Sequence, residues 1–281
     1  MKFKVAAQLS YEVKTQASII LNVHALRTPA QVIIEESFVI DPYIKSEEMA
    51  TLGFDHRLIR FEAAGPVQLN INYNALVDNA FTLIDHTNMA QLPINTFDAS
   101  ILPYLYPSRY CQNDKLYRLA NKMFGGIANP FELVSTIADW IHNNVEYLSG
   151  STNEQTSAFD TVTERAGVCR DFAHLGIALC RALDIPARYF TGYAYQLNPP
   201  DFHACFEAYI GGNWILFDAT RLVPLNGLVR IAAGRDAADA SIANLFGDVL
   251  FLNLQVSCEL ADDGFVPYYY QSGGMQGISY L

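Results

Sequence analysis

A cysteine, a histidine and an aspartate in the second half of this 281-residue chain could form a nucleophilic site. The cysteine is Cys169, which follows a glycine-containing turn and begins a stretch whose apolar residues recur at helical spacing. A cysteine in the first turn of a helix lies at the positive end of the helix macrodipole, which favours thiolate over thiol. Its backbone N–H is also an unpaired donor that could receive an oxyanion. Cys169 is therefore a candidate nucleophile, although a single cysteine is more often a small buried residue.

The histidine and the aspartate lie on two apolar runs joined by Gly211-Gly212, a pattern typical of a β-hairpin. With the two glycines as the loop, His203 and Asp218 become diagonal neighbours on one face, within reach of a hydrogen bond. A nucleophile, a base and a group that orients the base are what acyl-transfer chemistry requires. The order and spacing of these residues therefore predict a site made of Cys169, His203 and Asp218.

These three residues belong to a longer pattern. It consists of Gly167-Val168-Cys169-Arg170-Asp171-Phe172-Ala173, Ile185-Pro186-Ala187-Arg188-Tyr189, Gly192-Tyr193, His203-Ala204, Glu207-Ala208-Tyr209, Trp214 and Phe217-Asp218-Ala219-Thr220. The pattern resembles the transglutaminase-like superfamily of the papain-like fold, and most closely its bacterial two-domain members with a β-rich N-terminal domain. The resemblance covers nearly the whole chain. It implies that Cys169 is the nucleophile, that His203 is the general base and acid, and that Asp218 orients the imidazole.

One position departs from this family. Members usually have tryptophan two residues after the histidine, where this chain has Cys205, which adds a second thiol beside the predicted catalytic face. Two thiols, an imidazole and a carboxylate are also suitable Zn²⁺ ligands, so Cys169, His203, Cys205 and Asp218 could alternatively form a metal site. No closely spaced cysteine pair supports that alternative. We therefore expect no metal and no cofactor.

A papain-like site needs a second oxyanion donor upstream of the nucleophile. The segment 146–166 is mostly polar up to residue 157 and leads into the turn before Cys169. Tyr147, Gln155 and the backbone near Thr156 are all candidates. We predict that Tyr147 acts together with the backbone N–H of Cys169.

Composition limits the classes of function. Apolar residues make up 51% of the chain and charged residues 17%, which is typical of a globular protein. The formal net charge of −11 argues against a nucleic-acid partner and is compatible with a basic protein or an amine as substrate. The chain shows no export signal and no apolar run long enough to span a membrane. Its five widely spaced cysteines are read as reduced thiols, so we expect a cytoplasmic protein without a membrane partner.

The first 105 residues are predicted to form a β-rich domain. Strict alternation marks a half-buried strand with the core residues Phe3, Val5, Ala7, Leu9, Tyr11 and Val13. A second alternating set, Val32, Ile34, Phe38 and Ile40, is broken by Glu36. The runs 58–62 and 67–74 are joined through Gly65-Pro66 and are predicted to form a hairpin. No helical period occurs before about residue 100, so residues 1–105 are predicted to form an antiparallel β-sandwich-like domain.

Residues 106–281 are predicted to form the transglutaminase-like catalytic core, with a C-terminal strand and tail. Helical stripes occur at 116–124 and 134–145 and again after Cys169, and the hairpin and the alternating run 252–258 supply strands. The predicted class is α+β, with a helical part packed on an antiparallel sheet.

The predicted function is cysteine-dependent acyl transfer on a peptide or glutamine-type amide, through a thioester at Cys169. The thioester would pass to an amine acceptor, as in a transglutaminase, or to water, as in an amidase or cysteine protease. Either reaction requires a protein or peptide substrate. The alternative is a binding or scaffold module that keeps the fold without catalysis, and the intact Cys–His–Asp set argues against it.

Overall fold

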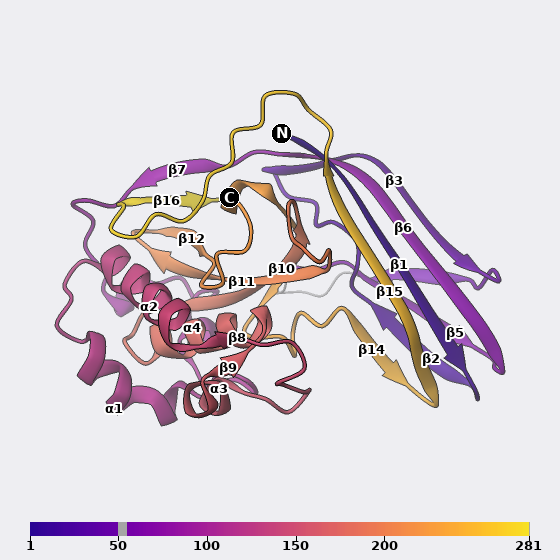
Figure 1. Ribbon diagram of the computed structural model, residues 1–281, viewed down its shortest axis with the longest axis horizontal. Helices are drawn as coiled ribbons and strands as arrows, with labels where there is room; N and C mark the ends of the chain where they lie inside the picture. Colours follow the sequence, from indigo (N-terminus) through magenta and orange to yellow (C-terminus); the bar gives the residue numbers. More distant parts are fainter. Residues whose placement is uncertain (50–54, 281) are drawn as a thin grey trace.

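The computed structural model describes residues 1–49 and 55–280. Two antiparallel sheets form the elongated half on the right of Figure 1. In spatial order, one sheet contains β15 (Val249–Leu260), β1 (Lys2–Val13), β6 (Val67–Asn79) and β3 (Gln31–Asp41). The other contains β14 (Ala243–Phe246), β2 (Ala17–Leu21), β5 (Leu58–Ala63) and β4 (Ser46–Met49).

The sandwich confirms one strand prediction and overturns another. The predicted core residues of β1 are all buried, whereas the predicted hairpin between β5 and β6 is wrong because the two strands lie in different sheets. Both strands bury apolar side chains, including Phe61 of β5 and Ile71 of β6, in the same core. The chain crosses between the sheets at Gly65, which has a positive φ of 52°. Alternation identified both strands, but it could not show which sheet each one joins.

A β-bulge changes the predicted burial of β3. The pairing of β3 with β6 shifts between Ile33 and Glu35, so Val32 and Ile34 are exposed. Glu36 instead accepts hydrogen bonds from Tyr73 and Arg57.

The other half of the molecule is a sheet with helices on it, on the left of Figure 1. The sheet order is β13 (Leu228–Gly234), β10 (Ala187–Ala194), β11 (Phe202–Ile210), β12 (Asn213–Phe217), β16 (Gln276–Ser279) and β7 (Thr82–Asp85), with antiparallel pairing throughout. The helices are α1 (Asn113–Phe124), α2 (Pro130–Asn144), α3 (Ala158–Glu164) and α4 (Cys169–Arg181). The short pieces are η1 (Ile94–Thr96), η2 (Leu102–Leu105), β8 (Glu146–Tyr147), β9 (Ala166–Gly167) and η3 (Leu225–Gly227). The predicted α+β class is therefore confirmed.

Each half of the molecule contains strands from both the N-terminal and the C-terminal parts of the chain. β14 and β15 come from the C-terminal part of the chain and pair with β2 and β1, while β7 pairs with β16. Buried amides add to this connection, since Gln31 binds the backbone N–H and C=O of Arg230, and Asn79 donates to the C=O of Leu228 at 2.7 Å. A domain boundary near residue 105 stays a prediction.

Helix α4 lies at the centre of the second half. It packs against α1, α2, α3, β10 and β11, and its residues from Asp171 onward are buried. Asp171 fixes the start of the helix, because its Oδ2 accepts from the Val168 N–H and from Thr152 Oγ1, each at 2.9 Å. No helix of the described residues is both long and apolar enough to cross a bilayer.

We expect Gly176→Ala to destabilise the protein. A Cβ at this position of α4 would lie 2.5 Å from Cε1 of Phe206, whose ring stacks on Phe217. Overpacking of this kind costs about 1–3 kcal/mol and exceeds the gain of about 1 kcal/mol in helix propensity. Urea denaturation should show a net loss of up to about 2 kcal/mol. The control is Gly126→Ala, where a Cβ meets nothing within 4 Å, and equal stability of the two variants would contradict the expectation.

Candidate active site

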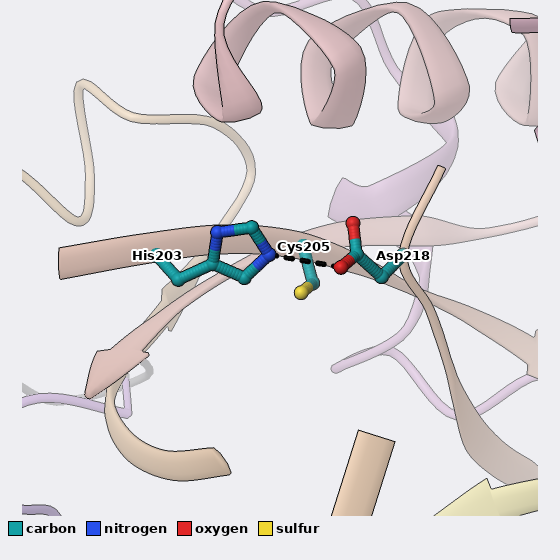
Figure 2. A group of neighbouring side chains, drawn as sticks. All are labelled: His203, Cys205 and Asp218. Atoms are coloured by element: carbon teal, nitrogen blue, oxygen red, sulfur yellow. Dashed lines mark hydrogen bonds and ion pairs between the residues drawn. The ribbon is translucent and has the colours of Figure 1, made fainter. Parts of the chain in front are cut away.

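A tight hairpin positions the predicted base and its carboxylate partner. β11 and β12 are joined through Gly211 and Gly212, both with positive φ, as the sequence predicts. The resulting register places Nε2 of His203 2.9 Å from Oδ2 of Asp218 (Figure 2). Both side chains are buried, so water does not weaken this contact.

Thr220 fixes the other carboxylate oxygen of Asp218. Oδ1 accepts from the Thr220 backbone N–H at 2.9 Å and from its hydroxyl at 2.7 Å. Burial raises the pKa of Asp218, but the charge of His203 and these hydrogen bonds lower it by more, so the net pKa is below the ordinary value. Sequence reasoning gave Thr220 no role, although an aspartate two residues before a threonine is a recognisable turn pattern.

The imidazole of His203 lies between Asp218 and Cys169. Burial lowers the pKa of His203, but the charge of Asp218 opposes it, and with further contributions from Cys205 and Cys169 the net pKa is well above the ordinary value. The Cys169 side chain is one of the groups that raise this pKa. Because Asp218 binds Nε2, the ring nitrogen that remains for a thiol is Nδ1. This nitrogen is buried and has no hydrogen-bond partner within the described residues.

Cys169 is the first residue of α4, as predicted, and its side chain is half-buried. Tyr147 approaches it from β8, which pairs with β9 just before the helix. Burial and then the charge of Cys169 raise the pKa of Tyr147, while His203 and a hydrogen bond from the Cys169 backbone N–H lower it. The Tyr147 hydroxyl therefore lies close to both Cys169 and His203. The alternative donors differ, since Gln155 is exposed and the backbone N–H of Thr156 donates to the Asn153 C=O at 3.3 Å.

Comparison with known families supports the resemblance. The family model described as "Bacterial transglutaminase, N-terminal domain" matches residues 1–100, and the model described as "Transglutaminase-like superfamily" matches residues 117–219. The second match contains Cys169, His203 and Asp218. The chain belongs to the transglutaminase-like superfamily.

A solved structure from Cytophaga hutchinsonii, provisionally described as a cysteine protease, is similar to this protein. The similarity covers 100% of this chain and 98% of the Cytophaga chain. The identity is 56% and the TM-score 0.98. An uncharacterized protein of Mycobacterium leprae is 28% identical over 146 residues, 49% of this chain and 52% of that protein. Another from Mycobacterium bovis is 39% identical over 69 residues, 25% of this chain and 22% of that protein. The chain thus spans about half the length, or less, of these curated relatives. The superfamily and the Cytophaga structure support a cysteine-enzyme type of function.

Cys205 lies beside the predicted base and its carboxylate partner. Ligand atoms of His203, Cys205 and Asp218 all lie within 4.8 Å of one another (Figure 2). Burial raises the pKa of the Cys205 thiol to about 12, whereas a zinc ligand must be a thiolate. The imidazole Nε2 and both carboxylate oxygens already have partners within the protein. The donor set is suitable for Zn²⁺, but in this arrangement the imidazole and the carboxylate already bind each other.

A buried ion network holds the strands of the superfamily core together. Glu207 on β11 accepts from Arg188 Nε on β10 at 2.6 Å and also binds Arg230 on β13. The guanidinium groups lie over rings as well, Arg188 at 4.3 Å from Trp214 and Arg230 at 5.1 Å from Phe190. The sequence showed Glu207 as part of a family pattern without a role. The structure shows that it links the strand carrying His203 to β10 beside it and to β13 on the far side of β10.

We expect Asp218→Asn to lower the pKa of His203. Removal of the carboxylate charge leaves burial as the main influence, and burial favours the neutral ring. In the parent protein the charged ring stabilises the fold below its unfolded pKa of about 6.5, and this contribution disappears as the pH rises through the raised folded pKa. Ring ¹⁵N chemical shifts of histidine-labelled protein would measure the pKa of His203 in both proteins, and urea denaturation at several pH values would measure the stability contribution. His24, whose pKa burial lowers to about 4, is the control, and an unchanged titration of His203 would contradict the assignment.

Proposed function

We propose that this protein is a cysteine-dependent acyl-transfer enzyme that acts on peptide or glutamine-type amides of protein or peptide substrates. The observation that carries the proposal is the position of the His203 imidazole, bonded to Asp218 through Nε2 and close to the Cys169 side chain. The raised pKa of His203 favours an imidazolium, the form that can protonate a leaving amine. A binding or scaffold module has no use for this arrangement.

In the first half-reaction, the Cys169 thiolate attacks the amide carbon. The developing oxyanion accepts from the Cys169 backbone N–H and from the Tyr147 hydroxyl, which must turn from accepting this N–H to donating toward the substrate. The imidazolium of His203 then protonates the leaving amine, the C–N bond breaks, and a thioester and a neutral ring remain. Asp218 acts as a positioning residue that holds the ring in the tautomer with its proton on Nε2.

In the second half-reaction, His203 takes a proton from the acceptor, which attacks the thioester and releases Cys169. With a primary amine the product is a new amide, and with water it is a carboxylic acid. The net charge of −11 suits an amine or basic acceptor and opposes a nucleic-acid partner. The proposal places this chemistry in the cytoplasm, consistent with five cysteines that are all free.

The test is competitive alkylation by iodoacetamide at neutral pH, with each cysteine followed by mass spectrometry. We expect Cys169 to react before Cys111 and Cys258, whose thiols have pKa values raised by burial. Cys169 is also more accessible than the buried Cys111, so a faster reaction alone would not prove activation. The matched control is therefore His203→Asn, which should slow the alkylation of Cys169 without changing its exposure. Equal rates in the parent and in His203→Asn would refute an activated nucleophile and favour the scaffold alternative.

A further inference from the structure

A cleft of about 600 Å³ lies beside the start of α4. Arg170, Tyr189 and Thr191 line one side, and the segment 237–246, which includes β14, lines another. Arg170 directly follows Cys169 in the chain. The Thr191 hydroxyl donates to the backbone C=O of His203 at 3.4 Å, so the wall of the cleft also contacts the strand that carries the candidate base. The cleft therefore extends from the neighbourhood of Cys169 to β14, which lies on the side of the sandwich toward the helices (Figure 1).

β14 is an edge strand. It pairs with β2 on one side, and in the described part of the chain no strand lies on its other side. The Asn22 N–H donates to the Ile242 C=O at 2.8 Å. In an antiparallel pair every second residue bonds to the partner strand, so this hydrogen bond shows which residues of β14 bond to β2. Asn244 and Phe246 then bond toward β2, whereas the backbone N–H and C=O groups of Ala243 and Leu245 point away from it. These outward groups can pair with a further strand.

The sequence of β14 does not protect this edge. Edge strands usually carry charged residues or proline, which discourage pairing with another chain. The opposite edge of the same sheet, β4, contains two glutamates, whereas β14 is Ala-Asn-Leu-Phe. Small residues before the strand, Ala240 and Ser241, leave space in the cleft, and the exposed ring of Phe246 offers an apolar contact.

We propose that an extended segment of the acyl-donor polypeptide binds in this cleft as an additional strand on β14, bonded to the backbone of Ala243 and Leu245, and thereby reaches Cys169. This inference rests on the proposed function and identifies its substrate class. Main-chain pairing gives affinity with little demand on side chains. The enzyme would therefore select unfolded or extended protein segments and not amides within folded domains or on small molecules.

The experiment measures binding, so it does not depend on turnover. Fluorescently labelled, unfolded casein is titrated with the Cys169→Ala protein, and anisotropy gives the Kd. Leu245→Pro removes an outward N–H that bonds nothing within the described chain, and proline is tolerated at such edge positions. We expect the Cys169→Ala/Leu245→Pro protein to bind about tenfold more weakly, through the loss of a hydrogen bond and the clash of the ring with an added strand. Leu245→Val keeps the N–H and should restore the Kd.

Absence of casein binding to Cys169→Ala, or equal binding by the proline variant, would overturn the inference. If circular dichroism shows that Leu245→Pro unfolds, the ligand is changed instead. Two versions of one casein-derived peptide are made, one N-methylated at its odd-numbered amides and the other at its even-numbered amides. Only one of the two peptides should lose binding, because only alternate amides of an added strand face β14. If both peptides bind alike, the inference is wrong. Failure of the alkylation test with intact casein binding would reject the proposed chemistry and leave the binding site.

Discussion

Cys169→Ala is expected to lower kcat/KM by about 10⁴-fold or more for any amide that the protein turns over. Without the sulfur no thioester forms, and only the oxyanion donors and substrate binding remain to accelerate attack by water. A screen for amine incorporation into casein and for casein cleavage would measure both outcomes of the proposed thioester. This loss is the largest single effect that the site geometry predicts.

The matched control for Cys169→Ala is Cys258→Ala. Cys258 is also incompletely buried, but it lies on β15 in the sandwich, so its removal should leave turnover unchanged. Turnover that persists in Cys169→Ala would place the nucleophile elsewhere. Cys205 would then be the first residue to examine, since it lies beside the His203 ring.

Glu207→Ala is expected to reduce stability by about 3–5 kcal/mol, because it leaves the buried guanidinium of Arg230 without its counter-charge and leaves Arg188 with only the half-exposed Asp55 at 3.2 Å. Arg188 and Arg230 are both almost fully buried, and Glu207 binds each of them. Urea denaturation would measure the loss. The control is Glu47→Ala, which removes an exposed pair with Arg60 and should cost about 0–1 kcal/mol.

The same network predicts a dependence of stability on pH. Burial raises the pKa of Glu207, but Arg188 and Arg230 lower it by more, so its folded pKa is below the unfolded value of about 4.3. Its contribution is therefore present above the unfolded pKa and is lost as the pH falls through the folded pKa. The parent protein should lose stability in this acid range faster than Glu207→Gln. Parallel acid limbs for the two proteins would show that Glu207 is not the group responsible.

Much of the candidate site could be predicted because its geometry follows from local rules. A helix start leaves the backbone N–H of Cys169 without a partner inside the helix, and a two-glycine loop determines which residues of two strands face each other. The distance between His203 and Asp218 follows from that register. The roles of these residues in catalysis stay predictions until they are tested by substitution.

The sequence by itself determined the three longest helices, several of the longer strands, the α+β class and the pairing of β11 with β12, because periodicity and turn residues act over short distances. Only the tertiary structure decided that β5 and β6 lie in different sheets, that β14 and β15 return to the sandwich, and that Glu207 lies between two arginines. Alternation reports which side of a strand is buried, but it contains no information about the partner on either edge. That partner depends on contacts between residues far apart in the chain, and here it also decides that β14 has one edge free beside the cleft.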